Sequence, residues 1–326
     1  MSIDITSEDG RPQLRGKRIA ITGATGLIGF PLLARLAEAN EVFALARLRQ
    51  QSDVDDVRRV GATPAVYDAM STDLSSLPDD IDVVFHLAAR TPVRERRTAD
   101  DQRLSIEANA HGTSRLMSRY RDAEAFVFAS TSSVYVPQEQ PMVEGDPFHV
   151  AEHHADGYVL SKIIAESIVK TLSAEWQLPA AILRIAQMYG PRGGAPTVRL
   201  DRIRRGANIP VYGTGPNAAT IMFEDDYVDK LIVAASVAST PPLVTNFAGT
   251  QTTIQEYCTI AGELLGVDVD FVTSSYATRP LPVDLTLMES MLGPVRTSVR
   301  DGVARTLAVA QEQRAIGWTG FDLPGD

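Results

Sequence analysis

The sequence predicts an α/β fold in which a doubly wound parallel sheet carries a smaller C-terminal lobe. Three observations predict this fold. Short apolar segments alternate with amphipathic ones as far as residue 188, a glycine-rich turn joins the first strand to the first helix, and the chain after Met188 becomes rich in glycine and proline. Apolar segments without a polar break are typical of parallel strands that are covered by helices on both faces.

The first strand is expected in "KRIAIT" at 17–22, followed by a helix in "LIGFPLLARLAEA" and a second strand in "EVFALA" at 41–46. This strand–helix–strand unit takes about thirty residues, the usual length of a βαβ unit. Further strands are expected in "PAVYD", "DVVFHLAA", "AFVFAS" and "AAILRIA", and a strand in "PLVTNFAG" is expected to return to the main sheet. Residues 1–16 are polar and aperiodic, so we expect a flexible N-terminal tail there.

The composition limits the classes of function. The 326 residues carry a net charge of −10, which argues against nucleic acid or an anionic membrane as the main partner. The single cysteine, Cys258, excludes an intrachain disulfide and a cysteine-rich metal site, and we expect it to be buried. The acidic start of the chain does not resemble a signal peptide, and no apolar run reaches transmembrane length, so we expect a cytoplasmic protein.

The glycine turn "TGATGLIG" places Gly23, Gly26 and Gly29 between a strand and a helix. Glycines permit a tight turn, and the free N–H groups of a helix N-terminus can bind a pyrophosphate. The spacing G-x-x-G-x-x-G differs from the dinucleotide fingerprint G-x-G-x-x-G, and such turns also serve plain packing. Its position in the first βαβ unit favours dinucleotide binding.

Tyr158 and Lys162, in "YVLSK", stand four residues apart and share one face of the expected helix. Such a pair alone is usually structural. In a chain that also has the glycine turn, the pair indicates a proton-transfer device.

These motifs and their order resemble those of the extended short-chain dehydrogenase/reductase family, also called the NAD-dependent epimerase/dehydratase family. The resemblance runs from about Arg18 to about Thr306. Its motifs are the glycine turn, Asp68, "HLAA" at 86–89, "NAHGT" at 109–113, "STSSVY" at 130–135, "YVLSK", "LRIAQMYGPRG" from 184 and "LGPVRTSVRDGVARTL".

The resemblance implies a Rossmann-type fold with three parts. The tail would end at residue 16, and residues 17–188 would form the NAD(P)-binding domain with the catalytic residues. Residues 189–326 would mostly form the substrate-binding lobe, with segments at about 220–250 returning to the main domain.

The resemblance also implies a catalytic set of Thr131, Tyr158 and Lys162. Tyr158 would exchange a proton with the substrate oxygen, and the ammonium and a positive nicotinamide ring would lower its pKa from near 10. Lys162 would also hold the nicotinamide ribose, and Thr131 would donate a hydrogen bond to the substrate oxygen. Ser130 and Ser132 are close enough in sequence to take the role of Thr131.

The expected cofactor-binding residues come from four motifs and the end of the second strand. They are Gly23, Thr25, Gly26, Leu27, Ile28, Gly29, Arg47, Asp68, Leu87, Ala88, Ala89 and Lys162. NAD-selective members usually end the second strand with an acid that binds the adenosine ribose. Here Arg47 and Arg49 follow the strand instead, and Asp53 and Asp55 come too late, which predicts that NADP(H) is preferred and NAD(H) possible.

Other polar residues receive structural interpretations. Asn109 would be the family's helix-bending asparagine, and His86 a buried histidine whose hydrogen bonds are satisfied. His153 and His154 would face solvent or the substrate mouth, because they have no acidic partner at ligand spacing, and no metal site is expected.

Three departures from the family pattern bear on the substrate. Ser132 and Ser133 stand where 4,6-dehydratases carry Asp-Glu, so dehydration by that route is disfavoured. Ala219 and Thr220 replace an Arg-Asp pair of nucleotide-sugar enzymes, and Gln187 replaces the asparagine of the substrate lobe. Ser132, Ser133 and Gln187 are the candidate substrate contacts. Five arginines could bind a phosphate or form a solvated face: Arg192, Arg199, Arg202, Arg204 and Arg205.

The sequence therefore predicts an NAD(P)-dependent oxidoreductase acting on a secondary alcohol or ketone of a sugar-like, possibly nucleotide-sugar, substrate, as an epimerase or a ketoreductase. The alternatives are an NADPH-dependent reductase of a non-sugar ketone and a non-catalytic dinucleotide-binding sensor. A homodimer is expected, because the apolar stripe of "YVLSKIIAESIVKTLSAEW" is wider than one buried face needs.

Overall fold

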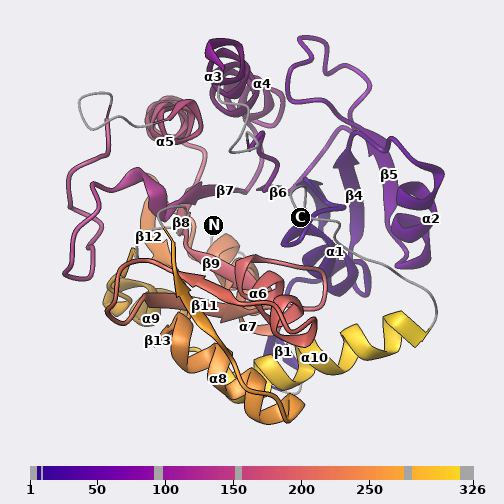
Figure 1. Ribbon diagram of the computed structural model, residues 1–326. Helices are drawn as coiled ribbons and strands as arrows, with labels where there is room; N and C mark the ends of the chain where they lie inside the picture. Colours follow the sequence, from indigo (N-terminus) through magenta and orange to yellow (C-terminus); the bar gives the residue numbers. More distant parts are fainter. Residues whose placement is uncertain (1–5, 9, 92–97, 151–155, 275–280, 316–326) are drawn as a thin grey trace.

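The computed structural model describes residues 6–8, 10–91, 98–150, 156–274 and 281–315 (Figure 1). Its centre is a sheet of seven parallel strands in the order β12-β8-β7-β6-β3-β4-β5. The strands are β3 (Arg18–Thr22), β4 (Glu41–Ala46), β5 (Thr63–Val66), β6 (Val83–His86), β7 (Ala125–Thr131), β8 (Ala180–Ile185) and β12 (Leu243–Phe247). The predicted doubly wound parallel sheet is confirmed, including the late strand that returns to it.

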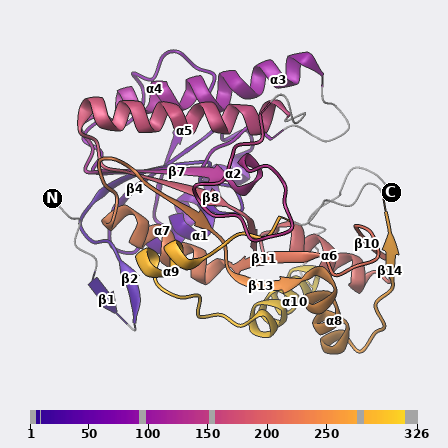
Figure 2. The same cartoon turned by 90° about the vertical axis from the view of Figure 1, so that its left-hand side faces the viewer.

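Helices cover both faces of this sheet, and Figure 2 shows the resulting layers. One layer consists of α3 (Ala99–Ile106), the π-helical turn Glu107–His111, α4 (Gly112–Arg119) and α5 (Gly157–Trp176). The opposite layer contains α1 (Gly29–Ala37), α2 (Gln51–Arg59), α7 (Glu224–Ser236) and α9 (Thr286–Leu292).

Alternation along the strands divides the interior into two cores. Ile19 and Ile21 of β3 pack with residues of α1 and α7, whereas Ala20 between them packs with residues of α4 and α5. Successive side chains of a strand point to opposite faces, so a strand buried on both faces needs an apolar residue at every position. This explains the unbroken apolar segments of the sequence.

The C-terminal lobe is built on two small sheets. One has the order β13-β11-β9, with β9 (Gln187–Tyr189), β11 (Ala218–Phe223) and β13 (Thr250–Thr253). The other pairs β10 (Ile209–Val211) with β14 (Phe271–Thr273). Around them lie α6 (Ala195–Arg204), α8 (Ile254–Leu265) and α10 (Val299–Ala315), which share a third core with the sheet β13-β11-β9.

The N-terminal segment differs from the flexible tail expected at residues 1–16. Strands β1 (Thr6–Glu8) and β2 (Arg11–Gln13) form an antiparallel hairpin. Arg11 forms an ion pair with Asp225 of α7 at 2.7 Å, and the Leu14 side chain is fully buried in the main core. For the described residues 6–8 and 10–16, the expectation of a loose tail was wrong because partners of this segment lie far away in the sequence, as Asp225 does from Arg11.

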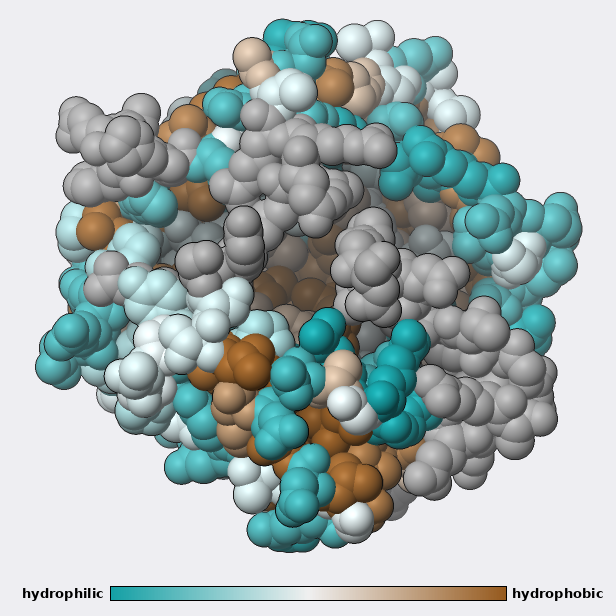
Figure 3. All heavy atoms as spheres, viewed as in Figure 1, coloured by the Kyte–Doolittle hydropathy of each residue, from teal (hydrophilic) through white to brown (hydrophobic). Residues whose placement is uncertain are grey.

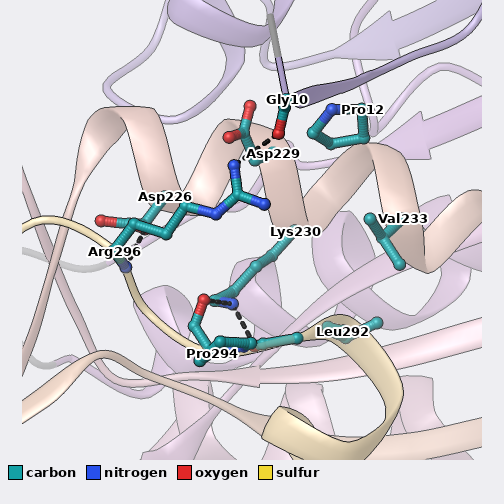
Figure 4. A pocket seen from close by; sticks show the side chains of 10 residues that line it. Gly10, Pro12, Asp226, Asp229, Lys230, Val233, Leu292, Pro294 and Arg296 are labelled. Carbon is teal, nitrogen blue, oxygen red and sulfur yellow. Dashed lines mark hydrogen bonds between the residues drawn. The ribbon is translucent and has the colours of Figure 1, made fainter. Parts of the chain in front are cut away.

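A cavity of about 230 Å³ lies between this hairpin, α7 and the segment that follows α9 (Figure 4). Its polar groups join these elements to one another. Asp226 accepts hydrogen bonds from the backbone N–H groups of Arg296 and Thr297 at 2.7 and 3.0 Å, and Lys230 donates to the carbonyl of Pro294 at 3.0 Å. These contacts anchor the chain between α9 and α10 against α7.

Within the part of the chain that the structure describes, none of the helices has the length and apolar character needed to cross a membrane. His153 and His154 lie outside the described residues. Cys258 is buried as expected, and burial raises the pKa of its thiol to about 12, which disfavours a nucleophilic role.

Candidate active site

The glycine turn forms a backbone cradle at the carboxyl end of β3. Gly23 has a φ of +67°, and a Cβ atom there would lie 2.9 Å from the backbone nitrogen of Ala88. A Cβ atom on Gly29 would lie 2.3 Å from the carbonyl oxygen of Gly23. Helix α1 starts without a side-chain cap, so its first N–H groups are available to an anion. Two of the three glycines therefore meet a steric requirement, and the turn has the form that a pyrophosphate needs.

A cavity of about 570 Å³ opens in front of this cradle. Eight of the twelve predicted cofactor residues line it: Gly23, Thr25, Gly26, Arg47, Asp68, Leu87, Ala88 and Ala89. Residues that the sequence did not single out complete the lining, among them Tyr67, Met70, Arg90 and Ala108. Most of the lining residues come from the loops after β3, β4, β5 and β6, because parallel strands bring their carboxyl ends to one edge.

Two arginines lie at the end of β4 on the wall of this cavity. Arg47 and Arg49 both line it, and Leu48 between them has a φ of +44°. This left-handed bend costs a residue with a side chain about 1–2 kcal/mol. Asp53 instead caps α2, where its carboxylate accepts a hydrogen bond from the backbone N–H of Gln50 at 3.4 Å. Asp53, the first acid after Arg47 and Arg49, is therefore engaged in capping α2.

His86, at the end of β6, is buried in a chain of neutral hydrogen bonds. Its Nε2 atom lies 2.9 Å from the Thr113 hydroxyl, which donates to the carbonyl of Asn109 at 2.6 Å. Thr113 must therefore accept from Nε2–H, which leaves Nδ1 to accept from the Thr22 hydroxyl at 2.7 Å. Burial, with the nearby Lys162 charge, lowers the pKa of His86 to about 3. The predicted core histidine is confirmed.

Asn109 lies in the π-helical turn between α3 and α4, and it links three parts of the site. Its amide donates to the carbonyl of Arg90 and to the hydroxyl of Ser161, both at 3.0 Å, while its Oδ1 accepts from the N–H of Arg90 at 2.7 Å. Ser161 in turn donates to the carbonyl of Tyr158 at 2.7 Å. Asn109 thus ties the loop after β6 to the helix that carries Tyr158, as expected of a helix-bending residue.

Lys162 lies on the inner face of α5 and is 2% exposed. Its ammonium donates to the carbonyl of Ala129 in β7 at 2.6 Å and lies 4.8 Å from the centre of the Phe128 ring. Burial lowers the pKa of Lys162 to about 8, against the charge of Glu166, which acts to raise it. The ammonium thus places a positive charge in a buried position near the carboxyl end of β7.

Tyr158 lies in the first turn of the same helix, one turn before Lys162. Asp156 caps this helix by accepting from the N–H of Val159 at 3.0 Å. Burial raises the pKa of Tyr158, while a hydrogen bond with the Thr131 side chain acts to lower it. The lowered pKa expected from the Lys162 ammonium was wrong for the protein alone, because Lys162 donates to Ala129 instead and desolvation of the phenol is the largest effect.

The hydroxyls after β7 point in different directions. Ser130 donates to Glu166 at 2.6 Å inside the protein, whereas Thr131 meets Tyr158. Ser132 is buried in a short 3₁₀ turn, Ser132–Val134, and the backbone N–H of Ser133 donates to the Thr131 hydroxyl at 3.2 Å. Ser130 is thus engaged by Glu166, and Thr131 at the end of the strand is the hydroxyl beside Tyr158. In the lobe, the buried Gln187 Oε1 atom has no hydrogen-bond partner among the described residues.

A buried ion pair beside the site was not expected from the sequence. Glu166 of α5 and Arg184 of β8 meet at 2.8 Å and are 0% and 2% exposed. Glu166 follows Tyr158 and Lys162 at the same four-residue interval, and this spacing was the available signal. Most arginines that could bind a substrate phosphate are held in the lobe instead. Arg205 pairs with Asp201, and Arg199 donates to the Tyr257 hydroxyl.

Arg192 is the exception in this arginine group. Its guanidinium lies 3.8 Å from the centre of the Phe30 ring of α1, close to the glycine turn.

The face of the molecule seen in Figure 1 is hollowed near its centre, and hydrophobic residues are visible inside the hollow (Figure 3). Among the described residues, no group of three or more His, Cys, Asp or Glu side chains could hold a metal ion.

Comparison with protein families gives one match that covers most of the chain. Residues 19–248 match the model described as the NAD dependent epimerase/dehydratase family. This range contains the glycine turn, both arginines after β4, Asp68, Thr131, Tyr158 and Lys162.

Individual relatives are similar over much of their length. A UDP-glucose 4-epimerase of Vibrio cholerae is 29% identical over 66% of this chain and 66% of its own. A UDP-glucose 4-epimerase of Mycolicibacterium smegmatis is 26% identical over 89% of this chain and 97% of its own. The solved structure of MoeE5 with UDP-glucuronic acid and NAD is 27% identical, covers 91% of this chain and 99% of its own, and superposes with a TM-score of 0.76.

The neutral His86 makes stability depend on pH. Its pKa is about 3 in the folded protein and ordinarily 6.5, so only the unfolded chain takes up this proton between these values. Stability is therefore lost as the pH falls from 6.5 toward 3, at about 1.4 kcal/mol per pH unit. His86→Gln should show a flatter decline of unfolding free energy in denaturant titrations. Identical slopes for the wild type and His86→Gln would contradict this interpretation.

Proposed function

Because the chain belongs to the NAD dependent epimerase/dehydratase family, we propose that it transfers a hydride between a nicotinamide cofactor and a secondary alcohol or ketone carbon of a sugar-like substrate. It would act as an epimerase or a ketoreductase. The observation that carries the proposal is the grouping of Thr131, Tyr158 and Lys162 where α5 crosses the carboxyl end of β7, at the same edge of the sheet as the glycine cradle. A non-catalytic sensor would not need this constellation.

The residues of the cradle fit a dinucleotide. A Cβ atom at Gly23 or Gly29 would fill the space, the start of α1 offers N–H groups, and Asp68 lies on the cavity wall. Leu27, Ile28 and Gly29 belong to the turn that would hold the pyrophosphate, and Ala88 and Ala89 to the wall behind it. When bound, a nicotinamide cofactor supplies the hydride acceptor or donor.

The protein's own groups handle the proton. Tyr158, whose pKa burial raises, is a neutral phenol at neutral pH and is ready to donate its proton to a ketone oxygen. Thr131 places a second hydroxyl at the same oxygen, where it stabilises developing negative charge. In the opposite direction Tyr158 must lose its proton, which the ammonium of Lys162 favours once it turns from Ala129 toward the site.

The substrate class is proposed from the relatives. Both epimerases above are named for UDP-glucose, and MoeE5 was solved with UDP-glucuronic acid. We propose a sugar-like substrate, possibly a nucleotide sugar, with Ser132, Ser133 and Gln187 as contacts. A non-sugar ketone remains the second candidate, because Ala219 and Thr220 supply no guanidinium for a phosphate.

One experiment separates the two reaction types. Purified protein is incubated with UDP-sugars, keto-sugars and simple ketones while nicotinamide absorbance and product are both measured. An epimerase forms product without net oxidation of the cofactor and often retains it, whereas a reductase consumes one NADPH per product. Turnover of none of these compounds with either cofactor would contradict both functions.

We also propose a preference for NADP(H). Arg47 and Arg49 lie on the cavity wall. Of the acids that follow, Asp53 caps α2 and Asp55 accepts a hydrogen bond from Gln51 in the same helix. A guanidinium can hold a 2′-phosphate through two parallel charge-assisted bonds. MoeE5 was solved with NAD, so the proposed NADP(H) preference is argued from Arg47 and Arg49 of this chain and not from the similarity to MoeE5.

A homodimer through α5 is the proposed assembly. Leu160 and Ile164 lie on the side of α5 away from the sheet, and Ile164 is 39% exposed. Family members commonly pack this helix and the preceding one against a partner, and α4 and α5 lie on the outer layer in Figure 2. We further assign residues 17–188 to cofactor binding and residues 189–326 mostly to substrate binding.

Tyr158→Phe should abolish turnover in the screen above and leave cofactor affinity and thermal stability nearly unchanged. The substitution removes only the hydroxyl that donates the proton. We expect a loss of at least a hundredfold in kcat. Activity within about tenfold of the wild type, about 1.4 kcal/mol in the barrier, would contradict the assignment.

Arg47→Ala should weaken NADPH binding roughly tenfold or more and leave NADH binding nearly unchanged, since one charge-assisted contact contributes about 1.5–3 kcal/mol. Calorimetric titration with both cofactors measures this. Arg58→Ala, which removes an exposed charge from α2, is the matched control and should change neither affinity. Equal affinities in the wild type, or tighter NADH binding, would show that the loop was misinterpreted.

Light scattering at micromolar concentration should give the mass of a dimer. Ile164→Glu should shift the mass to that of a monomer, because it places a charge in the apolar interface. Val267→Glu changes an exposed apolar residue of the C-terminal lobe and should leave the dimer intact. A monomeric wild type would refute the assembly.

A further inference from the structure

Three successive turns of α5 meet three successive residues of β7. The Thr131 side chain lies close enough to the Tyr158 hydroxyl to act on its pKa, and Lys162 donates to the carbonyl of Ala129 at 2.6 Å. Glu166, one turn further on, accepts from the Ser130 hydroxyl at 2.6 Å. Residues four apart lie on one helix face, so the same face carries the proton donor, the ammonium and a carboxylate.

Glu166 is fixed from the side opposite Ser130. Arg184 of β8 binds both of its oxygens, with Nε to Oε1 at 3.0 Å and Nη2 to Oε2 at 2.8 Å. A bidentate guanidinium–carboxylate contact sets both the position and the orientation of the carboxylate. The Lys170 ammonium lies 3.8 Å from Oε2 of Glu166, and the Lys170 side chain is 42% exposed.

Arg184 is itself held by the segment that follows β7. Its Nη1 donates to the Tyr135 hydroxyl at 2.9 Å and to the carbonyl of Glu144 at 2.8 Å. Tyr135 donates onward to Oδ1 of Asn246 in β12 at 2.6 Å. One buried hydrogen-bond network thus connects α5 to β7, β8 and β12 and fixes its position along the strand ends.

The electrostatic surroundings of Lys162 make Glu166 the acid that matters to it. From β7 it faces the Phe128 ring, and from β6 His86, which is neutral at physiological pH. On its own helix lie Tyr158 and Glu166, and Arg184 of β8 stands behind the carboxylate. Burial and Glu166 are the causes that set the pKa of Lys162 at about 8, with Glu166 acting to raise it.

We propose that Glu166 is a positioning residue for the reaction: with Arg184 and Ser130 it fixes α5 against β7, and it places a carboxylate one helical turn from Lys162 on the same face. The inference rests on the proposed function, because the charged Lys162 matters as the group that holds the nicotinamide ribose and supports Tyr158. Glu166 acts through Lys162 and touches neither substrate nor cofactor.

The test is NADPH and NADH affinity by calorimetry between pH 6 and pH 10. Affinity of the wild type should fall above about pH 8, as Lys162 loses its proton. In Glu166→Gln the fall should begin about one pH unit lower, because an opposite charge at this range shifts a pKa by about 1–3 units. The affinity of this variant at pH 8 should be about five- to tenfold weaker.

Matched variants separate charge from structure. Ser130→Ala removes the hydrogen bond but keeps the carboxylate, so the midpoint should stay with the wild type. Lys170→Met should behave in the same way, because its contact is long and half-exposed. Glu166→Gln/Arg184→Met leaves no unpaired buried charge and serves if the single variant does not fold. Because the Arg184 charge is removed as well, its midpoint should shift in the same direction as that of Glu166→Gln but by less.

An unmoved midpoint in folded Glu166→Gln or in the double variant would overturn the inference, because a merely structural role predicts weaker stability at every pH without a shift. If the wild type binds neither NADPH nor NADH, the proposed function fails, and this outcome is distinct from an unmoved midpoint.

Discussion

The docking of α5 along the carboxyl end of β7 is the constraint on which the rest of the site depends. Both partners are rigid: β7 is buried at every position, and α5 has twenty residues and a capped start. The docking places Tyr158 beside Thr131 and Lys162 against Ala129, whereas loops at the same edge of the sheet supply the cofactor cavity. A shift of α5 by one residue along its axis, about 1.5 Å, would separate both contacts.

Much of the fold was predictable because its signals are local. Seven main strands follow apolar segments, and the glycine turn lies where a strand meets a helix, since backbone sterics at Gly23 and Gly29 admit only glycine. The four-residue spacing of Tyr158 and Lys162 placed both on one face of α5 in the same way. Local patterns of this kind depend on neighbouring residues, which a single sequence displays.

The rest depended on contacts between distant residues. Asp225 holds the hairpin at Arg11, and Arg184 and Ser130 hold Glu166. No local sequence pattern predicts these pairings. The direction of the Tyr158 pKa was missed for the same reason, because burial outweighs a charge only once the fold is known. Of the three candidate hydroxyls, Ser130 is distinguished from Thr131 by its hydrogen bond to Glu166.

The central claim is that this docking presents Lys162 and Tyr158 to the nicotinamide end of a dinucleotide. A crystal structure of the protein with NADPH tests it most directly. The account predicts that the Lys162 ammonium lies within hydrogen-bond distance of the nicotinamide ribose hydroxyls, with the Tyr158 hydroxyl facing the reactive edge of the ring. A dinucleotide bound away from the glycine turn, or a ribose beyond the reach of Lys162, would contradict it.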